Sequence, residues 1–150
     1  MESISQYLTQ EHIYCDDLFA EAENDVGQGD WKAAEQAFNT FRAATLRHFT
    51  KEEEILFPAF ETTSGMAGGP IYIMRHEHAQ MRDVMQTMAD ALTSLDGDRY
   101  LGMSETLLML MRQHNMKEEQ MLYRMCDQVL AGESEALIDR MSAQSATVES

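Results

Sequence analysis

Apolar residues recur at three- and four-residue spacings along almost the whole chain, which is the pattern of amphipathic helices. In the first stretch these residues are Ile4, Tyr7, Leu8, Cys15, Leu18, Phe19 and Ala22. Residues 24–30, which include Gly27 and Gly29, interrupt the pattern, and Asp30 stands where an N-cap is expected before Trp31. The pattern therefore predicts one helix before this turn and a second helix after it.

Further breaks divide the rest of the chain. The second helix is expected to end near Pro58 to Glu61, and residues 62–69 are rich in Thr, Ser and Gly, as in a surface connection. A third helix is predicted to begin at Pro70 and to end at the break of residues 96–98, and a fourth is predicted to end before Gly132. No stretch alternates with period two for long enough to form a strand.

These elements predict an all-α fold in which an up-down-up-down four-helix bundle occupies residues 1–132. Residues 133–150 are expected to form a short amphipathic tail helix, with Leu137, Ile138 and Met141, and a disordered end. A chain of 150 residues fits one domain. It is long enough to bury roughly 70% of its unfolded surface, so it needs no disulfide or metal to fold.

Four histidines and two glutamates recur in the chain with a constant offset. The matching pairs, each 66 residues apart, are His12 with His78, His48 with His114, and Glu52 with Glu118. Their neighbours match as well, because Glu11 corresponds to Glu77 and Lys51 to Lys117. We interpret the chain as two helical hairpins, related by this internal repeat, that face each other across a shared polar site.

The histidines are predicted to lie at one level of the bundle. His12 is 17 residues before Gly29 and His48 is 19 residues after it, so at about 1.5 Å per residue both reach a similar height above the turn. The other two histidines have the same relation to the turn at Gly97. A scattered set of histidines would not converge on one layer in this way.

The spacing and chemistry of this layer predict a metal site. His48 and Glu52, and likewise His114 and Glu118, are four residues apart and share a helix face. Imidazole and carboxylate ligands suit iron, zinc or manganese, whereas the absence of thiolate pairs argues against structural zinc or an iron–sulfur cluster. We expect the four histidines to be terminal ligands and the two glutamates to bridge two metals. The alternatives are exposed helical ion pairs and a metal-free polar layer that fixes the register of the bundle.

The residues that carry this pattern resemble the signature of the hemerythrin-like, or HHE cation-binding, proteins. The matching segments are Glu11-His12, His48-Phe-Thr-Lys-Glu52-Glu53-Glu54-Ile-Leu56-Phe57-Pro58, Glu77-His78-Ala-Gln-Met-Arg82 and His114-Asn-Met-Lys-Glu118-Glu119. The resemblance covers residues 4–130 and implies a four-helix bundle with a non-haem di-iron centre. It implies two irons per chain, with zinc or manganese as substitutes, and it implies no separate catalytic residue.

The chain departs from the oxygen carriers of that family, which have a fifth histidine ligand. Met74 and Arg82 stand four residues before and after His78, and His76 is expected to point away from the site. The resemblance therefore lies closer to the branch that includes iron–sulfur repair proteins and iron- or oxygen-sensing domains. It implies a protein that binds or reacts with O₂, NO or peroxide, or that handles iron under stress. The alternatives are iron–sulfur cluster repair and a di-iron oxidase or peroxidase with true turnover, for which the sequence shows no substrate pocket.

Five further residues near the predicted site have open or secondary roles. Asp16, four residues after His12, is either an additional ligand or a helix-surface acid. Glu53 and Glu119 lie about 140° around their helices from the histidine face and are expected to be solvated. Tyr14 and Tyr123 are expected to pack in the bundle, with a hydrogen bond to a bound oxygen species as the alternative.

Charge and composition limit the partners. The chain carries 26 acidic and 11 basic residues, a net charge of −15, which argues against nucleic acids and anionic membranes. No run approaches the roughly 20 apolar residues of a membrane span, and the N-terminal residues lack the features of a secretory signal. We therefore expect a cytoplasmic protein in which Cys15 and Cys126 are reduced core thiols. The sequence leaves both a monomer and a homodimer open.

Overall fold

The computed structural model describes residues 2–66 and 68–149 of the chain, with side chains described up to residue 144. Every element within these residues is helical, as the sequence predicts. In chain order the elements are α1 (Ile4–Gly27), α2 (Trp31–Lys51), η1 (Glu52–Leu56), α3 (Phe57–Ser64), α4 (Pro70–Thr93), α5 (Gly97–Lys117), η2 (Glu118–Leu122), α6 (Tyr123–Val129), η3 (Ala131–Glu133) and α7 (Ser134–Glu149).

Side-chain caps begin three of the helices that carry the site, α1, α2 and α5. Ser3 Oγ accepts a hydrogen bond from the backbone of Gln6, whose side chain accepts one from the backbone of Ser3. Asp30 caps α2, as predicted, and Asp96 caps α5 in the same way. Gly29 has a φ of +74°, a conformation that glycine adopts without strain, so the chain turns sharply between α1 and α2.

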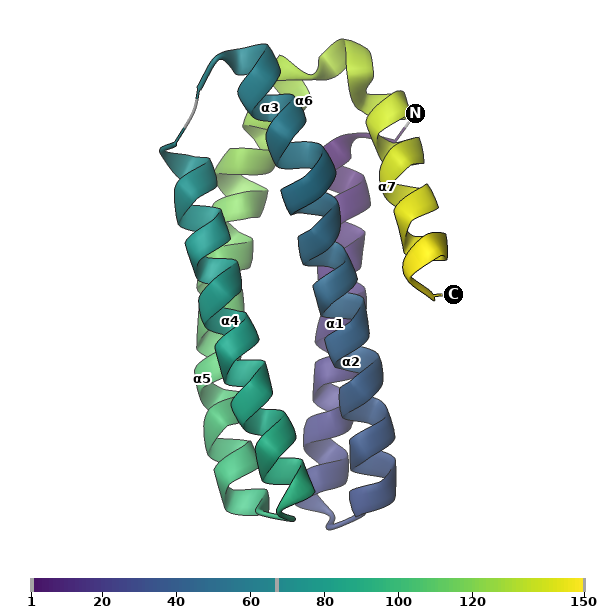
Figure 1. Cartoon of the computed structure of the whole chain (residues 1–150), viewed down its shortest axis with the longest axis vertical. Helices are drawn as coiled ribbons and strands as arrows, with labels where there is room; N and C mark the ends of the chain where they lie inside the picture. Colours follow the sequence, from purple (N-terminus) through teal and green to yellow (C-terminus); the bar gives the residue numbers. More distant parts are fainter. Residues whose placement is uncertain (1, 67, 150) are drawn as a thin grey trace.

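The helices form a bundle of two packed pairs (Figure 1). α1 packs along α2, and α4 packs along α5; each pair is joined by a turn of a few residues, so its two helices run antiparallel. The helical path continues from α2 through η1 and α3 to Ser64, three residues beyond the predicted end at Pro58 to Glu61. Pro58 lies in the first turn of α3, directly after the π-helical η1, where proline is tolerated.

The apolar core consists of two clusters on either side of a buried polar layer. One cluster occupies the end of the bundle with the two short turns and includes Phe38, Phe41 and Tyr100. The other surrounds η1, α3 and α6 and includes Phe57 and Phe60. Apolar packing above and below therefore shields the polar layer from water.

The tail helix α7 packs against the bundle beside α1, α2 and η1 (Figure 1). Leu137 and Met141 are buried in the second apolar cluster. The expected tail helix is thus present and extends to Glu149, while Ser150, the last residue of the predicted disordered end, lies outside the described residues. The domain boundary after residue 132 and the internal repeat stay predictions. No helix in the described part of the chain has the length and apolarity needed to cross a membrane.

Candidate metal centre

The structure brings all six predicted ligands into the buried layer, and none is more than 5% exposed. They are His12, His48, His78 and His114, which we call the ligand histidines after their predicted role, and Glu52 and Glu118, which we call the inner glutamates. Each helical run contributes to the layer: α1 and α4 carry one histidine each, whereas α2 with η1 and α5 with η2 carry a histidine and a glutamate. The prediction that these residues converge on one level is confirmed.

The ligand histidines form two pairs whose Nε2 atoms face each other. The Nε2 atoms of His12 and His48 are 3.1 Å apart, and those of His78 and His114 are 3.2 Å apart. Phe49 stacks on the His78 ring at a centroid distance of 4.0 Å and helps to fix its orientation. Such close nitrogen pairs require a proton or a cation between them, because two lone pairs at this distance repel.

Each ligand histidine is held at its other nitrogen by a carboxylate from a different helical run. The Nδ1 atoms lie 2.6–2.9 Å from these carboxylates. The pairs are His12 with Glu119, His48 with Glu11, His78 with Glu53, and His114 with Glu77. We call these four acids the outer glutamates. A carboxylate that accepts the Nδ1 proton leaves the Nε2 lone pair free for a metal, raises its basicity and orients the ring.

Basic side chains hold three of the outer glutamates in place. Lys51 binds Glu11, and Lys117 binds Glu77. Arg82 binds both carboxylate oxygens of Glu53 at 2.8 and 3.0 Å. Glu119, whose side chain is 38% exposed, forms no ion pair with a lysine or arginine among the described residues.

The expectation that Glu53 and Glu119 are solvated is wrong for Glu53, and it is only partly right for Glu119, whose exposed side chain still contacts His12. Both lie in the π-helical segments η1 and η2, where the wider turn reduces the angle between successive residues and brings these side chains toward the histidines. The sequence prediction used the ordinary α-helical rotation of about 100° per residue, which places these side chains too far from the histidine face. Glu11 and Glu77 were given no role from the sequence, although their matching positions beside His12 and His78 were visible there.

The inner glutamates are placed between the two histidine pairs. Glu52 Oε1 is 3.4 Å from His48 Nε2 and 3.2 Å from His78 Nε2. Glu118 Oε1 is 3.1 Å from His12 Nε2 and 3.2 Å from His114 Nε2. Each inner glutamate therefore approaches one histidine of each pair, as a carboxylate that bridges two cations must.

Tyr123 is the other polar residue that reaches the centre of the layer. Its side chain is fully buried, and its hydroxyl donates to Glu52 Oε2 at 2.7 Å and Glu118 Oε1 at 2.9 Å. The hydroxyl is also 3.1 Å from His12 Nε2. The sequence left two roles open for Tyr123, packing in the bundle and a hydrogen bond to a bound oxygen species. Packing alone does not describe its role, because its hydroxyl hydrogen-bonds both inner glutamates.

The donor set fits a pair of cations. Two sets of residues each offer donor atoms that all lie within 4.8 Å of one another. The first set is Glu52, His78, His114 and Glu118, and the second is His12, His48 and Glu118. Glu52 Oε1 and Glu118 Oε2 are buried without a hydrogen-bond partner among the described residues. Unpaired buried carboxylate oxygens are costly, and a metal ion would satisfy them.

The layer shifts the pKa values of its members. Burial alone would lower the pKa of His48, but the negative charge of Glu52 and the hydrogen bond to Glu11 raise it well above the ordinary value. The other three ligand histidines also have raised pKa values, because carboxylate contacts outweigh the opposing effect of burial. Burial opposes the ionisation of Glu118, but His114 and neighbouring donors hold its pKa well below the usual range. Protons therefore neutralise the carboxylates when no metal is bound.

The remaining candidates lie at the edge of the layer or outside it. Asp16 is exposed, and its pKa is raised by partial burial and by the charge of Glu119. Tyr14 and His76 are exposed, so the expectation that His76 points away is confirmed. Cys15 and Cys126 are buried free thiols, as expected, and Cys15 lines a small cavity beside His12 and His48.

The sequence matches a known domain family over most of its length. The family described as the hemerythrin HHE cation binding domain matches residues 3–126, which include all six ligand residues and the four outer glutamates. No solved structure matches the chain significantly.

Curated relatives match over shorter segments. The iron-sulfur cluster repair protein YtfE of Dickeya chrysanthemi (strain Ech1591) is 34% identical over an alignment of 88 residues, which covers 52% of this chain and 40% of that protein. The protein of the same name from Edwardsiella ictaluri (strain 93-146) is 36% identical over an alignment of 86 residues, which covers 51% of this chain and 38% of that protein. The chain therefore spans less than half the length of these relatives.

Removing the Tyr123 hydroxyl should destabilise the metal-free protein. Tyr123→Phe takes a donor from two buried carboxylates, which should lower the free energy of unfolding by about 1–3 kcal/mol in urea denaturation. Tyr100→Phe is the matched control, because Tyr100 is equally buried but its hydroxyl has no hydrogen-bond partner in the described part of the chain. That change should be neutral or slightly stabilising. Equal losses in both variants would contradict the hydrogen-bonding role assigned to Tyr123.

The metal-free protein should lose stability as the pH rises. A histidine whose pKa is raised by folding stabilises the fold fully below its unfolded pKa of about 6.5, and this stabilisation disappears as the pH passes the folded value. The lowered pKa of Glu118 acts oppositely, stabilising the fold above about pH 4.3. We expect the free energy of unfolding of the metal-free protein to be greatest at about pH 5–6.5 and to fall toward pH 9. Stability that rises between pH 6.5 and 9 would show that the histidines are not protonated in the fold.

Proposed function

The chain belongs to the hemerythrin HHE cation-binding domain family, and from this premise we propose that its polar layer holds two iron ions. His78 and His114 would bind one ion, and His12 and His48 the other. Glu52 and Glu118 would bridge them. One observation supports this proposal most strongly. The Nδ1 atom of each imidazole is bound to an outer glutamate, so the Nε2 atoms face each other in pairs with their lone pairs directed at the centre.

Iron suits this layer better than its substitutes. Four imidazoles and two carboxylates without a thiolate form a mixed nitrogen and oxygen donor set, which iron, manganese and zinc all accept. Family membership favours iron among these. A bound pair of irons would supply open coordination positions and electrons for small oxygen- or nitrogen-containing molecules. We therefore propose that the protein binds or reacts with O₂, NO or peroxide, or holds iron under stress.

The surroundings of His78 favour reactivity over reversible oxygen carriage. Met74 is buried in the apolar cluster, and Arg82 is bound to Glu53, so neither position supplies a further metal ligand. Each compact donor set contains two histidines, and the sets differ only in Glu52. A centre in which neither ion has a third histidine retains room for an exogenous molecule.

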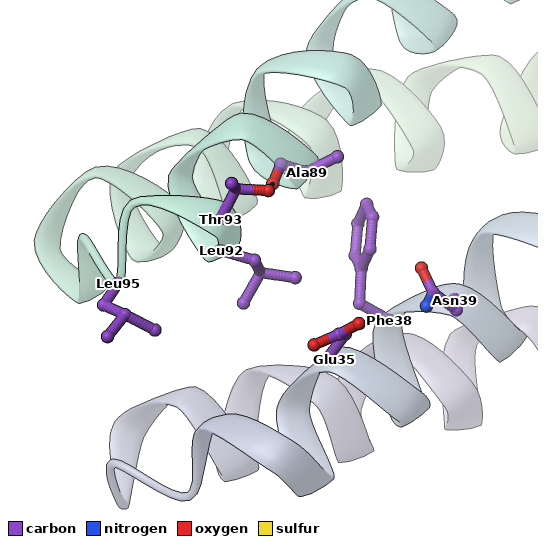
Figure 2. A pocket seen from close by; sticks show the side chains of 7 residues that line it. All are labelled: Glu35, Phe38, Asn39, Ala89, Leu92, Thr93 and Leu95. Atoms are coloured by element: carbon purple, nitrogen blue, oxygen red, sulfur yellow. Dashed lines mark hydrogen bonds between the residues drawn. The ribbon is translucent and has the colours of Figure 1, made fainter.

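Iron–sulfur cluster repair is the second candidate, and the relatives named YtfE support it. A turnover enzyme with an organic substrate has less support. The cleft in Figure 2, about 400 Å³, lies between α2 and α4, and its lining includes Phe38 and Leu92. Phe38 is ten residues before His48, or about 15 Å along the helix, so this cleft does not open onto the polar layer.

The remaining proposals concern context. Small molecules would be the partners, and the net charge of −15 disfavours nucleic acids and anionic membranes. A cytoplasmic location agrees with the reduced thiols. We also propose that the up-down-up-down bundle arose by duplication of a 66-residue hairpin, because the ligands and their outer glutamates match at that offset. A homodimer is compatible with this proposal.

Replacing one ligand histidine should empty the site. His48→Ala removes an Nε2 donor and leaves Glu11 without its imidazole partner, so most bound iron should be lost, as measured by metal analysis after anaerobic loading. His76→Ala is the control, since His76 is exposed two residues from His78 and should leave the iron content nearly unchanged. If His76→Ala removes as much iron as His48→Ala, the ligand assignment is wrong.

The reduced iron-loaded protein should react with O₂ without forming a long-lived reversible complex. Neither Met74 nor Arg82 completes the nitrogen ligand set, so we expect rapid oxidation in a stopped-flow experiment and ready binding of NO. Repeating the experiment with His76→Ala should give the same rates. An oxygenated spectrum that persists for hours and reverses on removal of O₂ would instead support storage or transport.

A further inference from the structure

The tail helix α7 lies outside the segment that matches the HHE family. The family match ends at residue 126, whereas α7 (Ser134–Glu149) follows it and packs against α1, α2 and η1 (Figure 1). Two polar contacts join α7 to these elements. Ser142 Oγ donates to the Tyr7 hydroxyl at 3.3 Å, and Gln144 Nε2 donates to Glu54 Oε2 at 2.6 Å. A segment beyond the family domain thus touches the two helical runs that carry His12, His48 and Glu52.

One of these contacts continues to a ligand histidine. The Tyr7 hydroxyl, which accepts from α7, also accepts from Lys51 Nζ at 2.8 Å. Lys51 binds Glu11 Oε2 as well, and Glu11 Oε1 lies 2.9 Å from His48 Nδ1. A continuous chain of polar contacts therefore leads from α7 to the imidazole of His48.

Lys51 is buried, which is rare for a lysine. This last residue of α2 is 3% exposed. A buried ammonium group is costly unless it is paired, and Glu11 and the Tyr7 hydroxyl are its partners. Because water does not reach the ammonium group, its attraction to Glu11 is stronger than in an exposed ion pair. Lys51 therefore holds Glu11 in the position in which Glu11 contacts His48.

The matching lysine in the other half is exposed to water. Lys117 binds Glu77, and Glu77 contacts His114, so the same three residue types recur at the offset of 66 residues. The Lys117 side chain is 44% exposed, however, and the position that matches Tyr7 is Ile73, an exposed apolar residue. Water and salt weaken such an exposed ion pair. The tyrosine and the tail helix therefore distinguish the two halves, although the ligands match.

We propose that α7 positions the ligand histidine His48 by keeping Lys51 and Glu11 in place. Tyr7, Lys51 and Glu11 are then positioning residues for one of the two metals. Displacement of α7 would let water reach Lys51, and the imidazole would lose its fixed orientation. Groups that hold a metal-binding histidine in this way commonly affect metal affinity by about 10–100-fold. The effect on metal affinity rests on the proposed function, whereas the effect on the orientation of His48 does not.

Hydrogen exchange in the metal-free protein tests the positioning of His48 without iron. Met141→Ala removes a buried side chain of α7 and should loosen this helix. The Nδ1 proton of His48 should then exchange with water about three- to tenfold faster, as measured by NMR on protein with nitrogen-15-labelled histidine. Exchange at His114 should be unchanged, whereas a general loss of stability would accelerate both histidines. Arg140→Ala, at an exposed position of the same helix, is the control and should change neither rate.

Anaerobic titration of the metal-free protein with ferrous iron tests the effect on the metal. Lys51→Met keeps a long side chain that tolerates burial but removes the charge that holds Glu11, so one of the two irons should bind about tenfold more weakly. Lys117→Met is the matched change in the other half. It removes an exposed ion pair and should alter iron affinity by less than about twofold. Tyr7→Phe removes only the hydroxyl and should have an intermediate effect.

Separate results would overturn the inference and the proposed function. Equal changes in exchange at His48 and His114 in Met141→Ala, or no change at either, would overturn this inference and leave the proposed function intact. Equal iron affinities of Lys51→Met and Lys117→Met would do the same. A wild-type protein that takes up no iron, but in which Met141→Ala accelerates exchange at His48 alone, would overturn the proposed function and support the positioning of His48 by α7.

Discussion

The structure of the polar layer depends on the hydrogen bond between the Nδ1 atom of each ligand histidine and an outer glutamate. Because every Nδ1 is bound to an outer glutamate, all four Nε2 atoms point inward and meet in pairs. This arrangement sets the orientation of the rings, the closeness of the inner glutamates and the need for positive charge at the centre. The neighbouring carboxylates raise the pKa values of the histidines, so that protons supply that charge when the site is metal-free. The two apolar clusters preserve the arrangement by keeping water out.

The sequence predicts the six ligands but only part of their support. Periodicity and turn residues locate the helices, and equal distances from two short turns bring the histidines to one level. A local departure from the α-helix is not visible in periodicity, because one wider turn changes only a few residues. The π-helical segments therefore went unpredicted, and with them the inward positions of Glu53 and Glu119. The sequence prediction also ended this helix at Pro58 to Glu61, a few residues before Ser64, because proline commonly ends a helix.

The two halves of the site match at the ligands and differ around them. Arg82 clamps Glu53 beside His78, whereas the residue 66 positions earlier is Asp16, an acid near the less constrained Glu119. Tyr123 likewise corresponds to an apolar residue in the other half. The His78 side is thus held by more donors and a fixed charge, while the His12 side adjoins the cavity. This asymmetry would give the two proposed metals different surroundings in a nearly symmetric bundle.

The account holds that the buried layer exists to bind two coupled irons. The most direct test is iron analysis combined with Mössbauer spectroscopy on the wild-type protein, loaded with iron anaerobically and then oxidised. The account predicts two irons per chain in a magnetically coupled pair, bound by histidine and carboxylate. One uncoupled iron per chain, or stoichiometric zinc in protein that takes up no iron, would contradict it.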